Sequence, residues 1–144
     1  MDALTIRPAR PEDIPAIAAL EEICFPADPW PAEIIARLQE RFIVAMQGDA
    51  LVGYAALSSI LDEGNLDNIA AAPDHRRQGI GEALLNEIIR LARERQLALL
   101  YLEVRAGNDA AIALYKKHGF QDVGRRKNYY EKPREDAILM TLVL

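Results

Sequence analysis

Between residues 76 and 81 the chain reads Arg76-Arg77-Gln78-Gly79-Ile80-Gly81, and this stretch decides the fold. It follows an apolar run that ends at Pro73 and opens a pattern in which Ile80, Leu84, Ile88 and Leu91 recur at helical spacing. Free N–H groups at a helix start favour an anion, and glycines let a phosphate approach the backbone. The stretch has neither the Gly-Lys-Ser/Thr of a Walker A loop nor a three-glycine dinucleotide fingerprint. It predicts either a phosphate-binding turn of another kind or an ordinary glycine-rich helix start with solvated arginines.

Ahead of this turn, strand and helix patterns alternate, and a segment with three prolines from Phe25 to Pro31 cannot be regular. The expected order is a strand at Thr5–Pro8, a helix from Pro11 through Leu20, a helix through Ile34, Ile35 and Leu38, a hairpin of Phe42–Ala45 with Leu51–Leu57, a turn at Asp62–Asn65, and a strand at Leu66–Ala71.

After the helix that starts at Ile80, the chain predicts one more helix and three strands. They are a strand at Leu99–Val104, a helix capped by Asn108-Asp109 that runs to Lys117 and stops at Gly119-Phe120, and strands at Gln121–Arg125 and Ala137–Leu144. The whole order, β α α β β β α β α β β, predicts an α/β protein with a mixed sheet and helices on both faces. We expect one domain over residues 1–144.

The composition of the chain argues against several classes of protein and of site. The 144 residues are 51% hydrophobic and 27% charged, with a net charge of −5, which argues against broad binding to nucleic acid. Charged residues interrupt every apolar run before it reaches the roughly 20 residues of a membrane span. The first residues carry no apolar signal core, so we expect a cytoplasmic protein. One cysteine and two histidines leave no basis for a disulfide or a metal site.

Two motifs carry a family resemblance. Arg76, Gly79 and Gly81 match the pattern Gln/Arg-x-x-Gly-x-Gly/Ala, and the stretch from Asn108 to Phe120 is similar to an Asn…Leu-Tyr…Gly-Phe hallmark. In this order and spacing they resemble the GNAT superfamily of N-acetyltransferases. The resemblance implies the GNAT fold, with a central mixed, mostly antiparallel sheet, and acetyl-CoA as co-substrate.

A narrower resemblance points to the RimI-type ribosomal-protein-alanine N-acetyltransferases. It rests on Leu102-Glu103-Val104-Arg105, Arg126-Lys127-Asn128-Tyr129-Tyr130 and Arg134-Glu135-Asp136-Ala137, with Phe25-Pro26 and Trp30 upstream. It implies transfer of an acetyl group from acetyl-CoA to the N-terminal alanine of a small-subunit ribosomal protein, by direct attack in a ternary complex. The early loop departs from that subfamily's Phe-Pro-x-Pro-Trp-Ser, because Asp28 lengthens it and Pro31 replaces the serine.

The chemistry needs a base, since an ammonium has no lone pair with which to attack a thioester. A protein α-amino group has a reference pKa near 7.7–8.0, against roughly 10.4 for lysine, so a carboxylate acting through water could suffice. Glu103 interrupts an apolar strand and should face away from Leu102 and Val104. The resemblance makes Glu103 the candidate base. A surface-facing glutamate, or one paired with Arg105, is the alternative.

Tyr115 follows Asn108 by seven residues, close to two helical turns. The resemblance implies that Tyr115 is the acid that protonates the departing CoA thiolate, and a phenol is a donor at neutral pH. A core tyrosine with its hydroxyl at the surface would fit the same pattern.

The resemblance also implies contact residues. Those expected for acetyl-CoA are Ile69, Ala70, Ala71, Arg76, Arg77, Gln78, Gly79, Ile80, Gly81, Glu82 and Asn108, with backbone N–H groups near Ile69 to Ala71 polarising the thioester carbonyl. Those expected for the acceptor are Trp30, Tyr129 and Tyr130. The alternatives are that Ile69 to Ala71 only form a core strand, that Asn108 is only an N-cap, and that Tyr129 and Tyr130 lie in a solvated hairpin.

Two other functions stay open. The acceptor could be a lysine side chain or a small amine, or the chain could be a non-catalytic sensor of acyl-CoA. The expected partner is the N-terminus of a ribosomal protein, with no direct nucleic-acid or membrane contact, and we expect a monomer.

Overall fold

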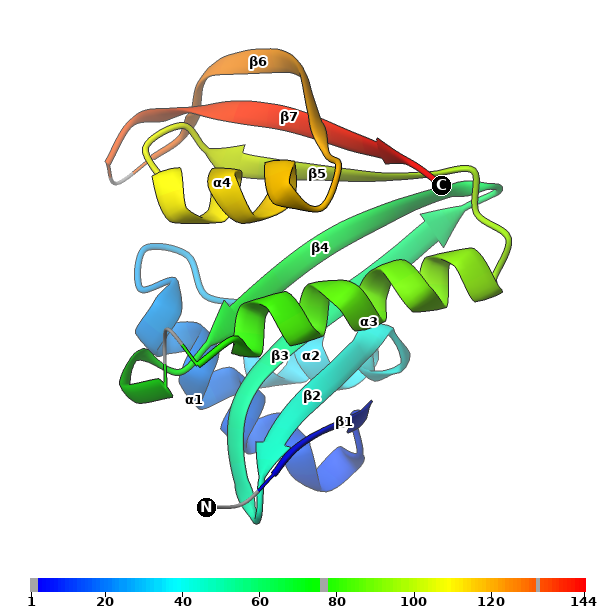
Figure 1. Ribbon diagram of the computed structural model, residues 1–144. Helices are drawn as coiled ribbons and strands as arrows, with labels where there is room; N and C mark the ends of the chain where they lie inside the picture. The colour runs from blue at the N-terminus through cyan, green and yellow to red at the C-terminus, as the bar shows by residue number, and fades with distance from the viewer. Residues whose placement is uncertain (1–2, 76–77, 132) are drawn as a thin grey trace. The chain divides into compact units, whose positions relative to one another are not determined.

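The computed structural model describes residues 3–75, 78–131 and 133–144 (Figure 1). Its strands and α-helices follow the predicted order: β1 (Leu4–Pro8), α1 (Ile14–Cys24), α2 (Ala32–Arg37), β2 (Phe42–Gln47), β3 (Ala50–Ile60), β4 (Glu63–Ala71), α3 (Ile80–Glu94), β5 (Leu99–Arg105), α4 (Asp109–Lys117), β6 (Gln121–Tyr130) and β7 (Glu135–Val143). Short 3-10 helices add Pro11–Asp13, Gln39–Arg41 and Pro73–His75.

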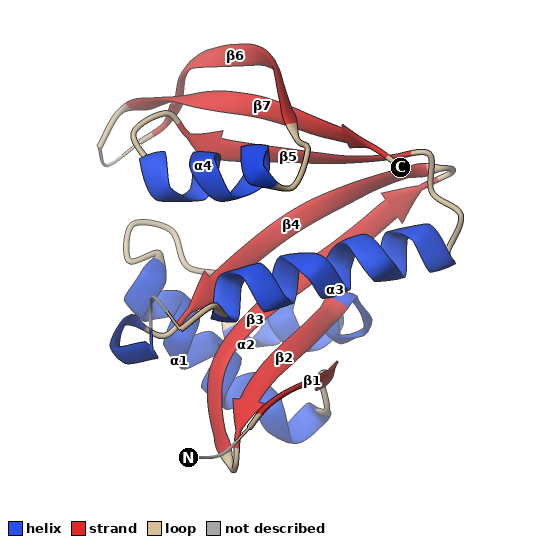
Figure 2. Ribbon diagram, viewed as in Figure 1, coloured by secondary structure: helices blue, strands red, loops and turns tan. Residues whose placement is uncertain are grey.

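The strands pair in the order β1-β2-β3-β4-β5-β7-β6 (Figure 2). β4 and β5 run parallel, whereas β1–β2, β2–β3, β5–β7 and β6–β7 are antiparallel. The predicted mixed, mostly antiparallel sheet is therefore confirmed. The described residues form two compact units, residues 1–58 with 67–90 and residues 59–66 with 91–144. That residues 1–144 form one domain stays a prediction.

The first unit holds β1, β2, most of β3 and α3, and the end of β4, with α1 and α2 behind these strands and α3 in front (Figure 1). One face of the strands packs against α1 and α2 through residues that are almost fully buried. These are Ile17, Leu20, Ile35, Phe42, Val44, Tyr54, Ala56 and Ala70. Burying such side chains stabilises the unit by about 1.5–3 kcal/mol each.

Gly53 lies on the other face of β3, where α3 crosses. A Cβ atom there would come within 2.8 Å of the Ala70 carbonyl oxygen and of Ile80, and within 3.1 Å of Leu84. Glycine at this position therefore sets how closely the first turns of α3 approach the sheet, and so where the Gln78–Gly81 segment lies.

An ion pair fixes the entry to α1. Both Asp13 carboxylate oxygens accept hydrogen bonds from the Arg7 guanidinium, at 2.7 and 3.0 Å, and one also accepts from the Arg10 N–H at 2.7 Å. These bonds favour the ionised carboxyl and lower the pKa of Asp13 below its usual value.

The second unit holds β5, β6, β7 and α4. Burial alternates along β5, as predicted: Leu100, Leu102 and Val104 are buried, and the residues between them are partly exposed. The predicted cap of α4 is confirmed, because the Asn108 side chain accepts from the Ala111 N–H at 3.2 Å. Gly119 ends that helix with a φ of +97°, a conformation that glycine adopts without strain.

Several predicted boundaries shift in the structure, among them the start of β4 and the end of β6. Glu63, Gly64 and Asn65 belong to β4, where a turn was expected, because they pair with Leu99, Leu100 and Tyr101 of β5. Pairing from a strand distant in sequence supplies hydrogen bonds that local turn propensity does not reveal. β6 likewise continues beyond Arg125 to Tyr130, where it pairs again with β7. None of the described helices is long and apolar enough to span a membrane.

Candidate active site

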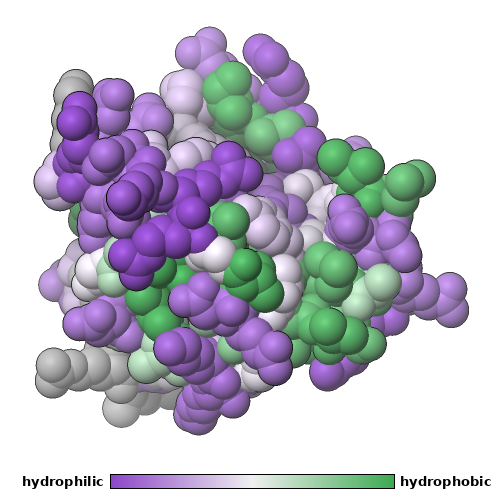
Figure 3. Space-filling model, turned by 90° about the horizontal axis from the view of Figure 1, so that it is seen from above, coloured by the Kyte–Doolittle hydropathy of each residue, from purple (hydrophilic) through white to green (hydrophobic). Residues whose placement is uncertain are grey.

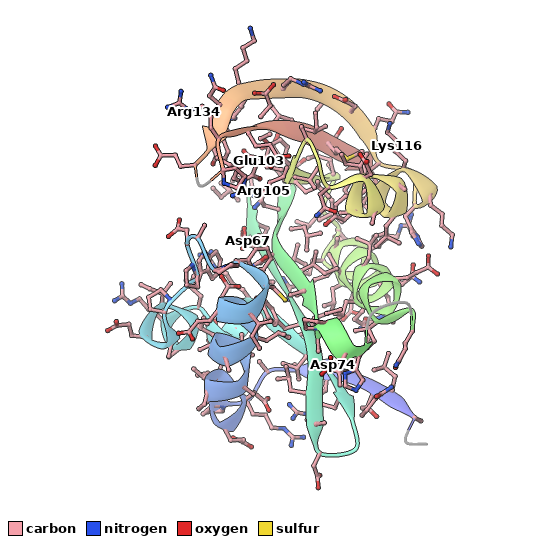
Figure 4. All side chains as sticks on the ribbon, turned by 90° about the vertical axis from the view of Figure 1, so that its left-hand side faces the viewer. Asp67, Asp74, Glu103, Arg105, Lys116 and Arg134 are labelled. Carbon is pink, nitrogen blue, oxygen red and sulfur yellow. The ribbon has the colours of Figure 1, made fainter. Side chains whose placement is uncertain are left out.

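β5 positions Glu103 on its partly exposed face, between Tyr101 and Arg105, which share that face by alternation (Figure 4). The Glu103 side chain is 21% exposed, and its carboxylate accepts a hydrogen bond from the Tyr101 hydroxyl at 2.9 Å. Nε of Arg126 on β6 lies 3.7 Å from the same oxygen. The predicted face of Glu103 is confirmed, and its carboxylate has both a phenol and a guanidinium as neighbours.

An irregularity in β6 brings two further tyrosines to Glu103. Arg126 pairs with Ala137 and Tyr130 with Glu135, so four steps along β6 match two steps along β7. Asn128, within this bulge, has a φ of +52°. In a regular strand Tyr129 would lie on the other face of the sheet from Arg126 and Tyr130. Here the rings of Tyr129 and Tyr130 instead make an edge contact, with their centroids 5.1 Å apart. The charge of Glu103 and a hydrogen bond to it raise the pKa of Tyr129.

Arg105 fastens the β6–β7 connection. Its guanidinium lies 3.2 Å from Oε1 of Glu135, donates to the Pro133 carbonyl at 3.1 Å, and covers the Tyr130 ring at 4.4 Å from the centroid. The ion-pair partner of Arg105 is thus Glu135, and the alternative in which Arg105 pairs with Glu103 is wrong. Arg105 thus holds the Tyr130 ring near the Glu103 carboxylate.

Tyr115 lies on α4 and is 6% exposed, with its ring 5.6 Å from that of Phe120. Burial, and then the neighbouring Tyr130, raises the pKa of Tyr115 to about 12. The phenol is therefore protonated at neutral pH. Tyr130, whose pKa is raised to about 12 by burial and then by the charge of Glu103, is the electrostatic neighbour of both predicted catalytic residues.

In the first unit, the predicted phosphate turn leads into α3. Gly79 has a φ of +78°, and apart from its two chain neighbours no described residue has an atom within 4 Å of where its Cβ would stand. Its carbonyl accepts from the Ala83 N–H at 2.9 Å, so α3 begins around Ile80, Gly81 and Glu82, and the Gln78 side chain lies 3.4 Å from that of Gln47. Arg76 and Arg77 lie outside the described residues.

The end of β4 carries the other predicted cofactor contacts. Ala70 is buried, whereas Ile69 and Ala71 are partly exposed. The Ile69 N–H donates to the Asn68 side-chain oxygen at 3.0 Å, and Sγ of Cys24 lies 3.7 Å from the Ala71 carbonyl oxygen. The N–H of Ile69 therefore already has an acceptor in this structure.

Sequence reasoning missed Glu21, which is 2% exposed. Its carboxylate accepts from the Trp30 N–H at 2.8 Å, from the Asn68 side chain at 2.6 Å and from the buried Tyr54 hydroxyl. Burial and then the hydrogen bond with Glu21 raise the pKa of Tyr54. Glu21 thus ties the loop that carries Trp30 to β3 and β4. Its position four residues after Ile17, on the apolar stripe of α1, was the signal that could have revealed it.

On the face shown in Figure 3, hydrophobic side chains form several separate groups among hydrophilic ones. The exposed large hydrophobic residues are Ile23, Phe25, Ile60, Leu61, Val123, Tyr129 and Val143. No group of three His, Cys, Asp or Glu side chains among the described residues is placed to hold a metal ion.

Comparison with known proteins identifies the family. Residues 14–120 match the Acetyltransferase (GNAT) family. The chain is 42% identical over 143 residues to the ribosomal protein bS18-alanine N-acetyltransferase of Escherichia coli strain K12, covering 96% of each chain. The crystal structure of the Escherichia coli ribosomal-protein-S18-alanine N-acetyltransferase matches with a TM-score of 0.90 and 41% identity, over 98% of this chain and 94% of that one. Ard1 from Thermoplasma volcanium matches with a TM-score of 0.91 and 30% identity, over 99% and 98%. The two sequence hallmarks and the strand order agree with these matches. The chain is therefore a member of the GNAT acetyltransferase family.

Proposed function

We propose that the chain is an Nα-acetyltransferase that moves the acetyl group of acetyl-CoA to the N-terminal alanine of a small-subunit ribosomal protein. Relatives with that activity in their names match nearly the full chain, at 42% identity for the Escherichia coli K12 protein. The observation that carries the proposal is the cluster around Glu103, whose carboxylate accepts from the Tyr101 phenol and raises the pKa of the adjoining Tyr129 and Tyr130, the latter after burial. Such a site suits a primary amine.

The start of α3 fits the pyrophosphate of acetyl-CoA. The first N–H groups of a helix have no partner within it, and the helix dipole favours negative charge there. The space that the described residues leave beside Gly79 gives room for a phosphate against the backbone. We propose that Gln78 to Glu82 hold this group, together with Arg76 and Arg77, which precede them in the sequence. Acetyl-CoA supplies the activated thioester carbonyl.

Glu103 would accept the proton of the incoming ammonium, directly or through water, so that the neutral amine can attack. Its position at a sheet surface, only 21% exposed, limits competing hydration of the carboxylate. Tyr101 orients the carboxylate by its hydrogen bond. A backbone N–H between Ile69 and Ala71 would stabilise the developing oxyanion. Asn108 would contact the pantetheine arm in addition to capping α4.

Tyr115 would donate its phenolic proton to the sulfur as the thioester bond breaks. The raised pKa of about 12 keeps that proton available at every physiological pH. The nitrogen loses two protons as the ammonium becomes an amide: Glu103 takes the first and passes it to solvent, and the second, lost after attack, replaces the proton that Tyr115 gives to the leaving thiolate. No acyl-enzyme is needed.

The acceptor peptide would contact Trp30, Tyr129 and Tyr130. The carboxylate of Glu21 holds the Trp30 backbone, and Arg105 holds the Tyr130 ring, so both contacts are prepared before substrate arrives. A protein with ribosomal substrates would act in the cytoplasm, and we propose that it works as a monomer.

The test is thiol release from acetyl-CoA with a peptide that begins with alanine. We expect rapid release from the unblocked peptide and none from the same peptide with an acetylated N-terminus. Glu103→Gln should lower kcat by about 10²-fold or more, with acetyl-CoA affinity nearly kept. Unchanged turnover in Glu103→Gln would remove Glu103 from the mechanism.

The same assay separates the other two functions. Release with a lysine peptide whose N-terminus is blocked, and none with the alanine-first peptide, would make this chain a side-chain or small-amine acetyltransferase. Tight binding of acetyl-CoA without release to any amine would make it a non-catalytic acyl-CoA sensor.

A further inference from the structure

Arg126 lies beside three members of the Glu103 cluster. Its Nε lies 3.7 Å from Oε1 of Glu103, and its Cζ lies 5.5 Å from the centroid of the Tyr129 ring. Burial and then the hydrogen bond with Glu103 raise the pKa of Tyr101, and the nearby Arg126 guanidinium partly offsets this rise. A carboxylate, a phenol oxygen and an aromatic face are the three groups that bind an organic cation.

We propose that Arg126 occupies the subsite for the substrate's α-ammonium group, and that the arriving N-terminus displaces the guanidinium. The inference rests on the proposed function, since it assigns that site a primary ammonium ligand. Arg126 would then pair with the Glu103 carboxylate while no substrate is bound, and the α-ammonium group of the substrate would replace it there.

The geometry favours displacement of Arg126 over a permanent pair. The Arg126 side chain is 55% exposed, and exposed ion pairs are weak, so breaking this one costs little. The separation of 3.7 Å is longer than a charge-assisted hydrogen bond, which leaves the carboxylate open to a closer donor. A small ammonium can approach Glu103 more closely than a planar guanidinium on a long stem.

Arg105, on the same face, provides the contrast. It is 32% exposed and bound by Glu135, by the Pro133 carbonyl and by the Tyr130 ring, so it stays in place. Among the described residues, Arg105 is thus a fixed cation that neutralises Glu135, and Arg126 is a releasable cation beside Glu103.

Arg125 offers a matched control. It neighbours Arg126 on β6, is similarly exposed at 56%, and pairs with Asp136 at 3.2 Å. Arg125→Gln and Arg126→Gln change the net charge equally, but only Arg126→Gln removes the guanidinium beside Glu103. Arg126→Lys keeps a cation at the same position.

The direct experiment follows the ring signals of Tyr129 and Tyr130 by NMR while alaninamide, a small primary ammonium ion, is added near pH 6.5. We expect Arg126→Gln to lower the Kd for alaninamide about two- to fivefold, the range that a weak ion pair sets. Arg125→Gln should leave the Kd unchanged, Arg126→Lys should stay near wild type, and N-acetylalaninamide should not bind.

Steady-state kinetics with the alanine-first peptide give a second measurement. Arg126→Gln should lower KM for the peptide by a similar factor with kcat nearly unchanged, because the base itself is intact. A higher KM or weaker alaninamide binding in Arg126→Gln would overturn the inference. So would equal effects of Arg125→Gln and Arg126→Gln, or no alaninamide binding by any of these proteins. If wild type fails to acetylate the peptide but Arg126→Gln still binds alaninamide more tightly, the proposed function fails and the ammonium subsite stands.

Discussion

At Tyr115, burial decides the protonation state of a side chain. The pKa raised to about 12 means that the phenol is protonated below that value and loses its proton only as the pH rises through it. We expect Tyr115→Phe to lower kcat on the order of 10²-fold, with the KM for acetyl-CoA little changed. The wild-type rate should show no alkaline loss from this group between about pH 7 and pH 10. A pH–rate profile of both proteins checks this, and an unaltered kcat in Tyr115→Phe would speak against the role.

Replacing Glu21 should destabilise the loop that carries Trp30. Glu21→Ala leaves the Tyr54 hydroxyl, the Asn68 amide and the Trp30 N–H without their common acceptor. We expect the free energy of unfolding to fall by about 2–4 kcal/mol. Tyr54→Phe, which removes one of the three donors, is the matched variant and should cost less. Urea denaturation measures both, and equal losses would show that Glu21 does not hold the loop.

Single residues of the candidate site differ in how far the sequence could predict them. Glu103 was predictable because a charged residue interrupts an alternating apolar strand, and the resemblance gave it a role. Arg126 was not, because its contact with Glu103 depends on how β6 pairs with β7 and β7 with β5, whereas Tyr101 shares a face of β5 with Glu103 by alternation. The proposed roles of Glu103 and Tyr115 remain predictions, whereas their placement on β5 and α4 is what the structure shows.

Among the elements, α4 depends on its first residue. The Asn108 side chain accepts from the Ala111 N–H, which would otherwise lack a partner at the helix start. Asn108→Ala should lower the free energy of unfolding by about 1 kcal/mol, and Asn108→Asp, which can also cap, should recover most of it. Thermal unfolding of the three proteins measures this. If Asn108→Asp were as unstable as Asn108→Ala, the cap would not explain the loss.

Most elements could be predicted because periodicity and turn residues are local properties. The order of strands and helices, the irregular Phe25–Pro31 segment and the cap at Asn108 all follow from such signals. The start of β4 and the end of β6 could not, because pairing with β5 and with β7 determines them. Gly64 alone suggests a turn, yet in the structure it pairs with Leu100 of β5, and a Cβ there would press on the side chains of Leu97 and Leu100.

For the whole molecule, stability should depend on pH through Asp13. Its pKa is lowered by the hydrogen bond from Arg7, so this contribution is present above the usual carboxyl value of 3.8 and is lost as the pH falls through the folded-state pKa. We expect Tm to fall between about pH 5 and pH 2, and to fall less in Asp13→Asn, which starts from a lower Tm at pH 5. Calorimetry across this range checks it, and equal slopes for both proteins would contradict the assignment.

The bulge of β6 makes the number of residues between Arg126 and Tyr130 matter as much as their identity. Removing Lys127 or Asn128 would change the strand by one residue and so reverse which way the following side chains point. Tyr129 would then turn from Glu103 while every amino acid named in the cluster was still present in the chain. Natural variants should therefore show substitutions in this stretch more often than insertions or deletions. A designer who wishes to reshape the site should substitute its residues and keep its length.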